Sequence, residues 1–495
     1  MRTFLAVALT CGVLVGVPTL AAETPGSESK DRSQYLTLTL SDRVRGEFVD
    51  WFEPKPAANA SGAQRYDFFG NQFRLGVRLD VPHLVFYVEG QYTQIDNLPS
   101  DASLSRTNGG NLGPGAIYFA NTHDGDQGEP FLKQGYFTLK DLPDADGFAF
   151  TGGRFEYSDG LETVPADPAL AWLKRTRIAE RLIGPFGYTD VTRSFDGGRL
   201  VYDVPAFNVT GMVTAPTQGG FEISANKELN IWLAGFAVTL KQLENMVPFD
   251  ARLFYIFYRD NRDQTTIADN RLTLKPAPKD HNPITLHTWG AHAISVVDVG
   301  PGKADGLLWG ALQSGDWGSQ NDFGWAYAVE TGYQLPQLFA APWLRVGYDR
   351  SSGDRDPNDG SHKTFFQILP TARTYAQTPF YNLMNSSDLF AELVLKPHSK
   401  VTVRTDYHWL QLTESQDLWY SGGGATNETF FGYQGLNSGG RHDLGSLLDT
   451  SVTVSILKQL TAYCYYGHTF GESVVKTTFA GANMNFGYVE LTYRY

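Results

Sequence analysis

The sequence predicts an all-β protein, a transmembrane antiparallel β-barrel of outer-membrane type with about 18 strands. Three features indicate this fold class: recurrent alternating segments, connections that alternate between short and long, and a two-faced last strand. In that strand Val489, Leu491 and Tyr493 share one face, and Glu490 and Arg494 share the other. Successive side chains of a strand point to opposite sides, so one face suits lipid and the other suits water. A half-buried edge strand of a soluble protein would alternate in the same way, so this strand alone does not distinguish a membrane barrel from a soluble protein. The other segments of the chain distinguish them.

The amino-terminal residues predict an exported protein. Residues 1–22 combine a short basic start, an apolar run from Phe4 to Leu20 and small residues after it, which is the pattern of a cleaved signal peptide. Cleavage would leave Cys464 as the remaining cysteine, so we expect no intramolecular disulfide. We expect three parts: a signal peptide at 1–22, a periplasmic stretch at 23–33 and a single barrel domain at 34–495.

Eighteen segments alternate apolar and polar residues with a period of two, as half-exposed strands do. Most are at least as long as the roughly 9–11 residues that a tilted strand needs to cross a bilayer. The predicted strands are residues 35–52, 65–81, 83–96, 130–141, 147–157, 193–204, 206–215, 229–243, 249–261, 284–298, 304–315, 322–335, 342–351, 386–397, 399–413, 443–456, 459–471 and 483–495.

The connections between these segments alternate in length. Short ones such as 80–83, 141–144 and 298–301 contain the Asp, Pro and Gly residues of tight turns. The connections on the other side run over 53–64, 97–129, 158–192, 216–228, 262–283, 352–385 and 414–442, with shorter ones at 316–321 and 472–482. Short periplasmic turns opposite long extracellular loops are typical of outer-membrane barrels, and an even strand count places both termini on the periplasmic side.

The same alternation assigns charged side chains to the lumen. An arginine on the lipid face costs about 2–4 kcal/mol at the bilayer midplane, so arginines within strands should face inward. The arginines assigned in this way are Arg43, Arg45, Arg74, Arg78, Arg199, Arg345, Arg404 and Arg494. The acids on the same side are Glu47, Asp80, Glu89, Glu330, Asp349, Glu392, Asp406 and Glu490. Many of these charges could simply pair across strands and hold the wall, so both roles stay open for each residue.

The composition and the motifs exclude several function classes. A net charge of −13 argues against a nucleic-acid partner, and no apolar run is long enough for a helical membrane span. No nucleotide-binding or hydrolase motif occurs, so we expect neither an enzyme nor a cofactor. Residues 354–360 resemble a calcium loop but lack its glycine and glutamate, which favours an Asx-rich turn. His287 and His292 are five residues apart on one strand, hence on opposite faces, and no metal site is predicted.

Three blocks of the sequence resemble the alginate export family of outer-membrane barrels. They are Gly-Gly-Arg-Phe-Glu-Tyr at 152–157, the run 180–185 continued at 193–200, and the run 352–360 continued at 363–366 and 369–372. The resemblance spans most of the mature chain. It implies a barrel channel whose arginine-rich constriction passes a polyuronate outwards.

The resemblance also implies residues for that constriction. The family motifs point to Arg154, Arg181, Arg193 and Arg199. The chain departs from the family pattern at Phe155, where glutamine is common. Arg154 shares the parity of Phe148 and Phe150, so it faces the lumen only if a bulge forms at Gly152. With the strand arginines added, the predicted anion path comprises Arg154, Arg181, Arg193, Arg199, Arg74, Arg78, Arg345 and Arg404.

A basic constriction also has a physical basis. A carboxylate-bearing sugar loses water in a narrow pore, and guanidinium groups replace that water with paired hydrogen bonds. The long segment 158–192 carries Lys174, Arg175 and Arg177, and Asp167 followed by proline predicts the start of a short helix. We expect this segment to fold inward and to add positive potential; folded outward, it would be a solvated basic face.

These observations predict a passive channel in the outer membrane that passes an anionic or polar saccharide down its gradient. Its partners would be the membrane lipid, the polysaccharide or small polar solute, and export components of the periplasm or inner membrane. An uptake porin for small anions or sugars is one alternative. A barrel enzyme acting on lipid or glycan is another, in a different class.

Overall fold

The computed structural model describes residues 35–55, 62–241, 247–263, 268–371 and 377–495. The predicted signal peptide, 1–22, and the predicted periplasmic stretch, 23–33, lie outside the described residues. Within the described part of the chain, no helix is both long and apolar enough to cross a bilayer.

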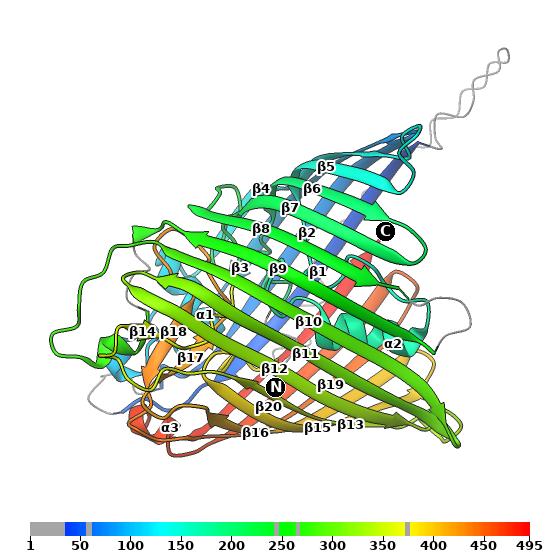
Figure 1. Cartoon of the computed structure of the whole chain (residues 1–495). Coiled ribbons are helices and arrows are strands. Elements are labelled where there is room, and N and C mark those ends of the chain that lie inside the picture. The colour runs from blue at the N-terminus through cyan, green and yellow to red at the C-terminus, as the bar shows by residue number, and fades with distance from the viewer. Residues whose placement is uncertain (1–34, 56–61, 242–246, 264–267, 372–376) are drawn as a thin grey trace, which may run out of the picture.

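Eighteen antiparallel strands in the described part of the chain form one closed barrel (Figure 1). The last strand pairs with the first, from Ser41 opposite Arg494 to Asp50 opposite Asn485. The barrel strands are β1 Leu36–Asp50, β2 Arg65–Val81, β3 Leu84–Asp96, β4 Gln127–Lys140, β5 Phe148–Phe155, β6 Phe195–Asp203, β7 Phe207–Pro216, β8 Ile231–Leu240, β9 Phe249–Asp260, β10 Ile284–Val299, β11 Gly302–Trp317, β12 Gln320–Gln334, β13 Trp343–Ser351, β15 Ser386–His398, β16 Val401–Leu412, β19 Asp443–Ser455, β20 Leu460–Gly471 and β21 Asn483–Arg494. A two-residue segment, β14 (Ser361–His362), adds a short parallel pairing to β12.

The predicted fold class is confirmed. Each predicted segment coincides with one barrel strand, and the ends differ by three residues at most, as at β4, predicted to begin at 130 and observed to begin at Gln127. The alternation of short and long connections is also observed, because β2–β3, β6–β7 and β10–β11 are joined tightly, whereas β3–β4 and β5–β6 are joined by long segments.

The two faces of the wall follow the sequence parity. On β2, Leu75, Val77 and Leu79 point outward with 51%, 43% and 37% of their surface exposed, whereas Gln72 on the opposite face is buried. Aromatic residues such as Trp232 continue this outward apolar surface on other strands. Apolar residues therefore cover the outside of the closed sheet, and polar residues alternate with them on the inside. This is the arrangement of a barrel that has lipid outside and water inside.

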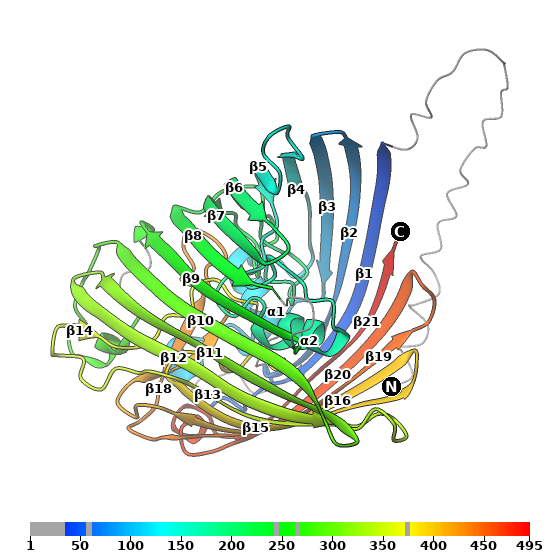
Figure 2. The same cartoon turned by 45° about the vertical axis from the view of Figure 1, so that its right-hand side comes forward.

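The long connections contain the remaining elements, and two of their helices lie inside the ring of strands (Figure 2). These elements are η3 Arg106–Asn108, α1 Pro114–Thr122, α2 Pro168–Leu173, η4 Lys174–Ile178, η6 Asn270–Thr273, β17 Leu418–Gly422, β18 Tyr433–Asn437 and α3 Val475–Thr478. Side chains from different connections meet in a buried apolar core: Ile183 forms a backbone bridge with Leu369, and Phe366 and Trp419 belong to the same buried cluster. The interior of the barrel is therefore partly filled by its own loops.

Candidate functional site

The segment that joins β5 to β6, residues 156–194, enters the lumen and is called the lumen loop below. It begins its helix where the sequence predicted: the Asp167 carboxylate accepts hydrogen bonds from the backbone N–H groups of Ala169 and Leu170, both at 2.9 Å. Pro168 occupies the first turn, where its missing N–H costs nothing. The expected inward position of this segment is observed, because its side chains bond to lumen-facing residues of distant strands.

The basic residues of the lumen loop dock on acids of the wall. Lys174 Nζ lies 2.6 Å from Asp250 on β9, and Arg177 Nε lies 2.9 Å from Glu330 on β12. In the opposite sense, Arg252 of β9 holds two loop acids, Asp159 at 2.6 Å and Glu162 at 2.7 Å. All of these side chains are at least 96% buried. Buried charges persist only when they are paired, so this part of the loop is fixed to the wall.

The other end of the lumen loop is fixed to β1. Arg43 Nη2 lies 3.0 Å from Asp190, and Arg45 Nη1 donates to the Tyr188 carbonyl at 2.6 Å. Arg45 also pairs with Glu490 of β21 at 2.6 Å, across the closing seam of the barrel. The loop therefore spans the lumen from the closing seam to β9 and β12.

A continuous network of charges surrounds Glu330. Its carboxylate contacts Arg177 and Arg181 of the lumen loop at 2.9 Å and Arg345 of β13 at 3.1 Å. Arg345 also reaches Asp305 and Glu392 at 3.1 and 3.3 Å. The remaining ion pairs of the network are Arg181 with Asp349 at 3.3 Å and Arg404 with Glu392 and Asp406, both at 2.9 Å.

This network changes the role of three predicted path residues. Arg181 and Arg345 are fully buried, Arg404 has 13% of its side chain exposed, and each of the three contacts two or more carboxylates. They hold the lumen loop and the wall in place, which is the structural role left open in the sequence analysis. The expected positive potential of the lumen loop is reduced for the same reason, although Arg175 of this loop is exposed.

Arg193 is also withdrawn from the lumen solvent. It is fully buried, lies 5.2 Å from the centre of the Phe186 ring and donates a long hydrogen bond, 3.4 Å, to the Gly423 carbonyl. Burial lowers the pKa of Arg193 to about 10, since no carboxylate in the described part of the chain compensates it. Its position indicates a packing role between the lumen loop and residues that follow β17.

Arg154 requires a correction. The register of β5 against β4 and β6 shows no shift, so the bulge needed at Gly152 does not form. Arg154 consequently keeps the outward parity of Phe150 and pairs with Asp196, directly opposite on β6, at 2.6 Å. It belongs to the outer face of the wall and not to the lumen.

The remaining predicted arginines, Arg74, Arg78 and Arg199, lie on the lumen side of β2 and β6 and keep access to solvent. Arg78 has 39% of its side chain exposed, and Tyr136 of β4 interacts electrostatically with both Arg78 and Arg199. Arg199 lies over the Phe155 ring at 5.4 Å and forms no ion pair with any described residue. Arg78, Tyr136 and Arg199 are called the basic face below.

Cations outnumber acids around the basic face. Arg74 and Lys133 share Glu156 at 3.1 and 3.0 Å, and Arg78 and Lys140 share Asp80, both at 3.1 Å. Burial opposes ionisation of Glu156, but the two neighbouring cations outweigh it and hold its pKa at about 2. Arg74 also lies 3.9 Å from Glu89, and Lys140 lies 3.9 Å from Asp141. Four acids therefore face four cations, and Arg199, which has no ion pair among the described residues, leaves a local excess of one positive charge.

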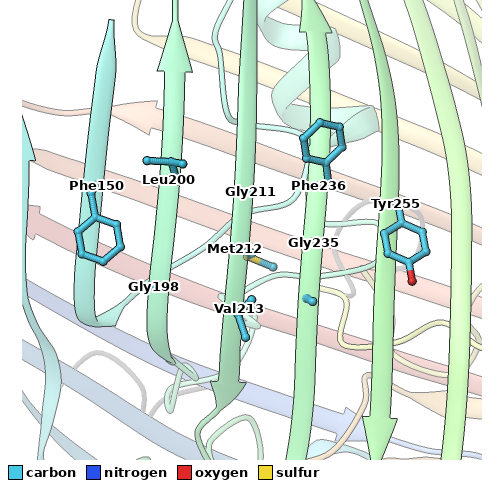
Figure 3. Close-up of a pocket in the computed structure, with 10 residues that line it drawn as sticks. Phe150, Gly198, Leu200, Gly211, Met212, Val213, Gly235, Phe236 and Tyr255 are labelled. Carbon is cyan, nitrogen blue, oxygen red and sulfur yellow. The ribbon is translucent and has the colours of Figure 1, made fainter. Parts of the chain in front are cut away.

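An apolar groove of about 540 Å³ lies elsewhere, across β5 to β9 (Figure 3). Glycines at 198 and 211 form part of its floor, and Phe150, Leu200 and Phe236 border it. These three side chains are 40–51% exposed on the outward parity of their strands. The groove faces the lipid side, so it is not part of a solute path.

The comparisons with known proteins agree with this architecture. A family model described as alginate export matches residues 105–486. The chain belongs to the alginate export family. Comparison with curated protein sequences gave no match.

Solved structures of outer-membrane porins share the fold. A BenF-like porin from Pseudomonas fluorescens Pf-5 superimposes with a TM-score of 0.57 at 9% identity, covering 93% of this chain and 99% of that chain. OccAB2 of Acinetobacter baumannii gives 0.56 at 9% identity, covering 93% and 98%, and Pseudomonas aeruginosa OpdK with vanillate gives 0.54 at 8% identity, covering 92% and 98%. At these identities the likeness concerns the fold. Together with the family match, it identifies the chain as a porin-like channel of the outer membrane.

Several residues of the lumen were not singled out from the sequence. Asp250, Arg252 and Asp305 have the inward parity that marked their neighbours, and this signal could have found them. Lys133 could not have been found in this way, because an irregularity in the β3–β4 register between Glu89 and Gly90 changes the parity there.

Proposed function

We propose that the protein is a passive channel that passes an anionic saccharide along the basic face of its lumen. The observation that carries this proposal is that Arg78 and Arg199 retain solvent access and Arg199 has no ion pair among the described residues, whereas Arg181, Arg345 and Arg404 each contact two or more carboxylates. A guanidinium group can pair with the carboxylate of a uronic acid through two hydrogen bonds. Tyr136, which interacts electrostatically with both arginines, adds an aromatic surface.

Planar-bilayer recording tests this proposal directly. In a salt gradient the reversal potential of the wild-type channel should have the sign of an anion-selective pore. Arg199→Ala and Arg78→Ala should each move this reversal potential toward zero. Arg154→Ala is the matched control, because Arg154 is the same residue type on the outer face and is paired with Asp196. Cation preference in the wild type, or an equal effect of all three substitutions, would overturn the assignment.

A second candidate is uptake of small carboxylates. It is favoured by the fold shared with porins, because one of the matched structures is OpdK with vanillate, an aromatic carboxylate. Added oligouronate and added vanillate should distinguish the two. Block of the current by oligouronate alone supports the saccharide path, and block by vanillate alone supports the uptake porin.

A further inference from the structure

Three potential metal ligands converge on the lumen side of β16 and β19. Asp406 of β16 lies directly opposite Asp449 of β19 in the antiparallel register, and His408 follows two residues later on the same face of β16. One ligand atom from each side chain lies within 4.8 Å of the other two. Asp406, His408 and Asp449 are 1%, 2% and 4% exposed, so the cluster is enclosed by protein.

Acidic side chains of three neighbouring strands lie next to one another at this cluster. Asp406 has an acid opposite it on each side, Glu392 on β15 and Asp449 on β19, and like charges directly opposite one another destabilise a sheet. Arg404 contacts Glu392 and Asp406, but no arginine or lysine of the described residues forms an ion pair with Asp449. The Asp449 carboxylate accepts a hydrogen bond from the Tyr465 hydroxyl at 3.1 Å.

One oxygen of the cluster lacks a partner. Asp406 Oδ2 lies against Arg404, whereas Asp406 Oδ1 is buried without a hydrogen-bond partner in the described part of the chain. A buried carboxylate oxygen without a donor costs free energy that a cation in the adjacent space would recover. The unpartnered oxygen and the converging ligand atoms are two separate indications of a bound cation.

The histidine is held in the way that metal-binding histidines are held. His408 Nδ1 lies 2.9 Å from Asp388 Oδ2 and 3.4 Å from the Tyr381 hydroxyl. This contact fixes the ring and leaves Nε2 as the nitrogen available to a ligand. A carboxylate that orients the second nitrogen of a ligating histidine is a usual companion of metal sites.

We propose that Asp406, His408 and Asp449 bind a divalent metal ion of the zinc type. One imidazole and two carboxylates suit Zn²⁺ or Mn²⁺ better than Ca²⁺ or Mg²⁺, which prefer oxygen ligands throughout. Two ligands at about 2.0–2.2 Å from one Zn²⁺ stand no more than about 4.4 Å apart, which is close to the 4.8 Å within which these ligand atoms lie. Water or a further oxygen would complete the coordination.

The ion would add two positive charges to the end of the ion-pair network that holds the lumen loop. Arg404 links the site to Glu392, and Arg345 links Glu392 to Glu330, where the loop docks. Binding would therefore stabilise the wall without any contribution to the solute path on the opposite side.

The test uses untagged full-length protein in detergent, stripped with EDTA, and titrated calorimetrically with ZnCl₂ and MnCl₂ at pH 7.5. The expected result is binding of one Zn²⁺ per chain and a rise in the unfolding temperature. Asp449→Asn, a nearly isosteric change, should weaken binding at least 100-fold, and Asp388→Asn should weaken it about 10–100-fold through loss of ring orientation. His292→Gln is the matched control, since His292 is a buried lumen histidine paired with Asp250 at 2.7 Å.

Two outcomes would overturn the proposal. One is the absence of Zn²⁺ binding in the wild type, which would leave a proton shared by Asp406 and Asp449 as the means of neutralisation. The other is equal affinity in the wild type and Asp449→Asn. If Asp449→Asn does not fold, visible absorption of bound Co²⁺ in His408→Gln and His292→Gln decides: the signal should be lost in the first and kept in the second, and its retention in His408→Gln refutes the site.

Discussion

Replacing Glu330 by glutamine should detach the central part of the lumen loop from the barrel wall. The substitution preserves size and removes one charge. Glu330 is the acid on which Arg177 and Arg181 of the loop and Arg345 of the wall meet, at 2.9, 2.9 and 3.1 Å. No lipid contact changes, because Glu330 is buried on the lumen side of β12.

The size of the effect follows from what each guanidinium retains. Arg181 keeps Asp349 at 3.3 Å, and Arg345 keeps two further carboxylates. Arg177 loses a two-pronged pair and keeps Asp349 at the longer distance of 3.8 Å. Removing one partner of a buried ion pair costs about 3–5 kcal/mol, and we expect the lower end because two of the three groups stay paired.

Unfolding with guanidinium chloride in detergent micelles measures this loss of stability. Bilayer recording should also show a larger or noisier conductance, because the lumen loop would be held less firmly. Glu472→Gln is the control, since the Glu472–Lys476 pair is 56% exposed on both sides and should contribute less than about 1 kcal/mol. If Glu330→Gln and Glu472→Gln differ by less than about 1 kcal/mol in stability, the docking role of Glu330 is refuted.

Three further changes test local features of the loops. Asp167→Ala should destabilise the protein by about 1 kcal/mol through loss of the helix cap, and Asp167→Asn should restore most of it in the same unfolding assay. The low pKa of Glu156, about 2 against an ordinary 4.5, contributes stability that is present above pH 4.5 and is lost as the pH falls toward 2; thermal unfolding of Glu156→Gln should lack this dependence. Burial and neighbouring acids raise the pKa of Asp354 from 3.8 to about 6, so the folded state loses stability as the pH rises through this window. Asp354→Asn should therefore unfold at a higher temperature than the wild type at pH 8 and show no gain at pH 4, and a loss at pH 8 would contradict the reasoning.

The strands could be predicted from the sequence because each carries its own signal. In β2 the alternation of apolar and charged residues around Leu75 predicts both that the segment is a strand and which of its faces contacts lipid. The long loops carry no such signal, since their core forms between residues as distant as Ile183 and Leu369. In the lumen loop the sequence predicted one element, the helix that begins after the capping residue Asp167.

The arginines of the predicted anion path were less reliable, because the alternation along a strand shows which face a residue lies on but not which acids it pairs with. Arg345 and Arg199 have the same inward parity, but only Arg345 meets carboxylates on the neighbouring strands β11, β12 and β15. That difference depends on the register between strands, which one sequence does not display. The same limit hid the proposed metal site, because Asp406 and Asp449 are 43 residues apart in sequence and become neighbours only through the pairing of β16 with β19.

An anion path is compatible with a chain of net charge −13, because the potential in a pore is set by charges within about 8–10 Å of the solute. The acids of the lumen concentrate on β9 to β19, and the lumen loop covers them with Lys174, Arg177 and Arg181. What stays accessible on the opposite side is the basic face, where Arg199 has no acidic partner among the described residues. In the proposed channel, the lumen loop would therefore narrow the barrel and, by pairing with the acids of one wall, would direct a charged solute to the basic face.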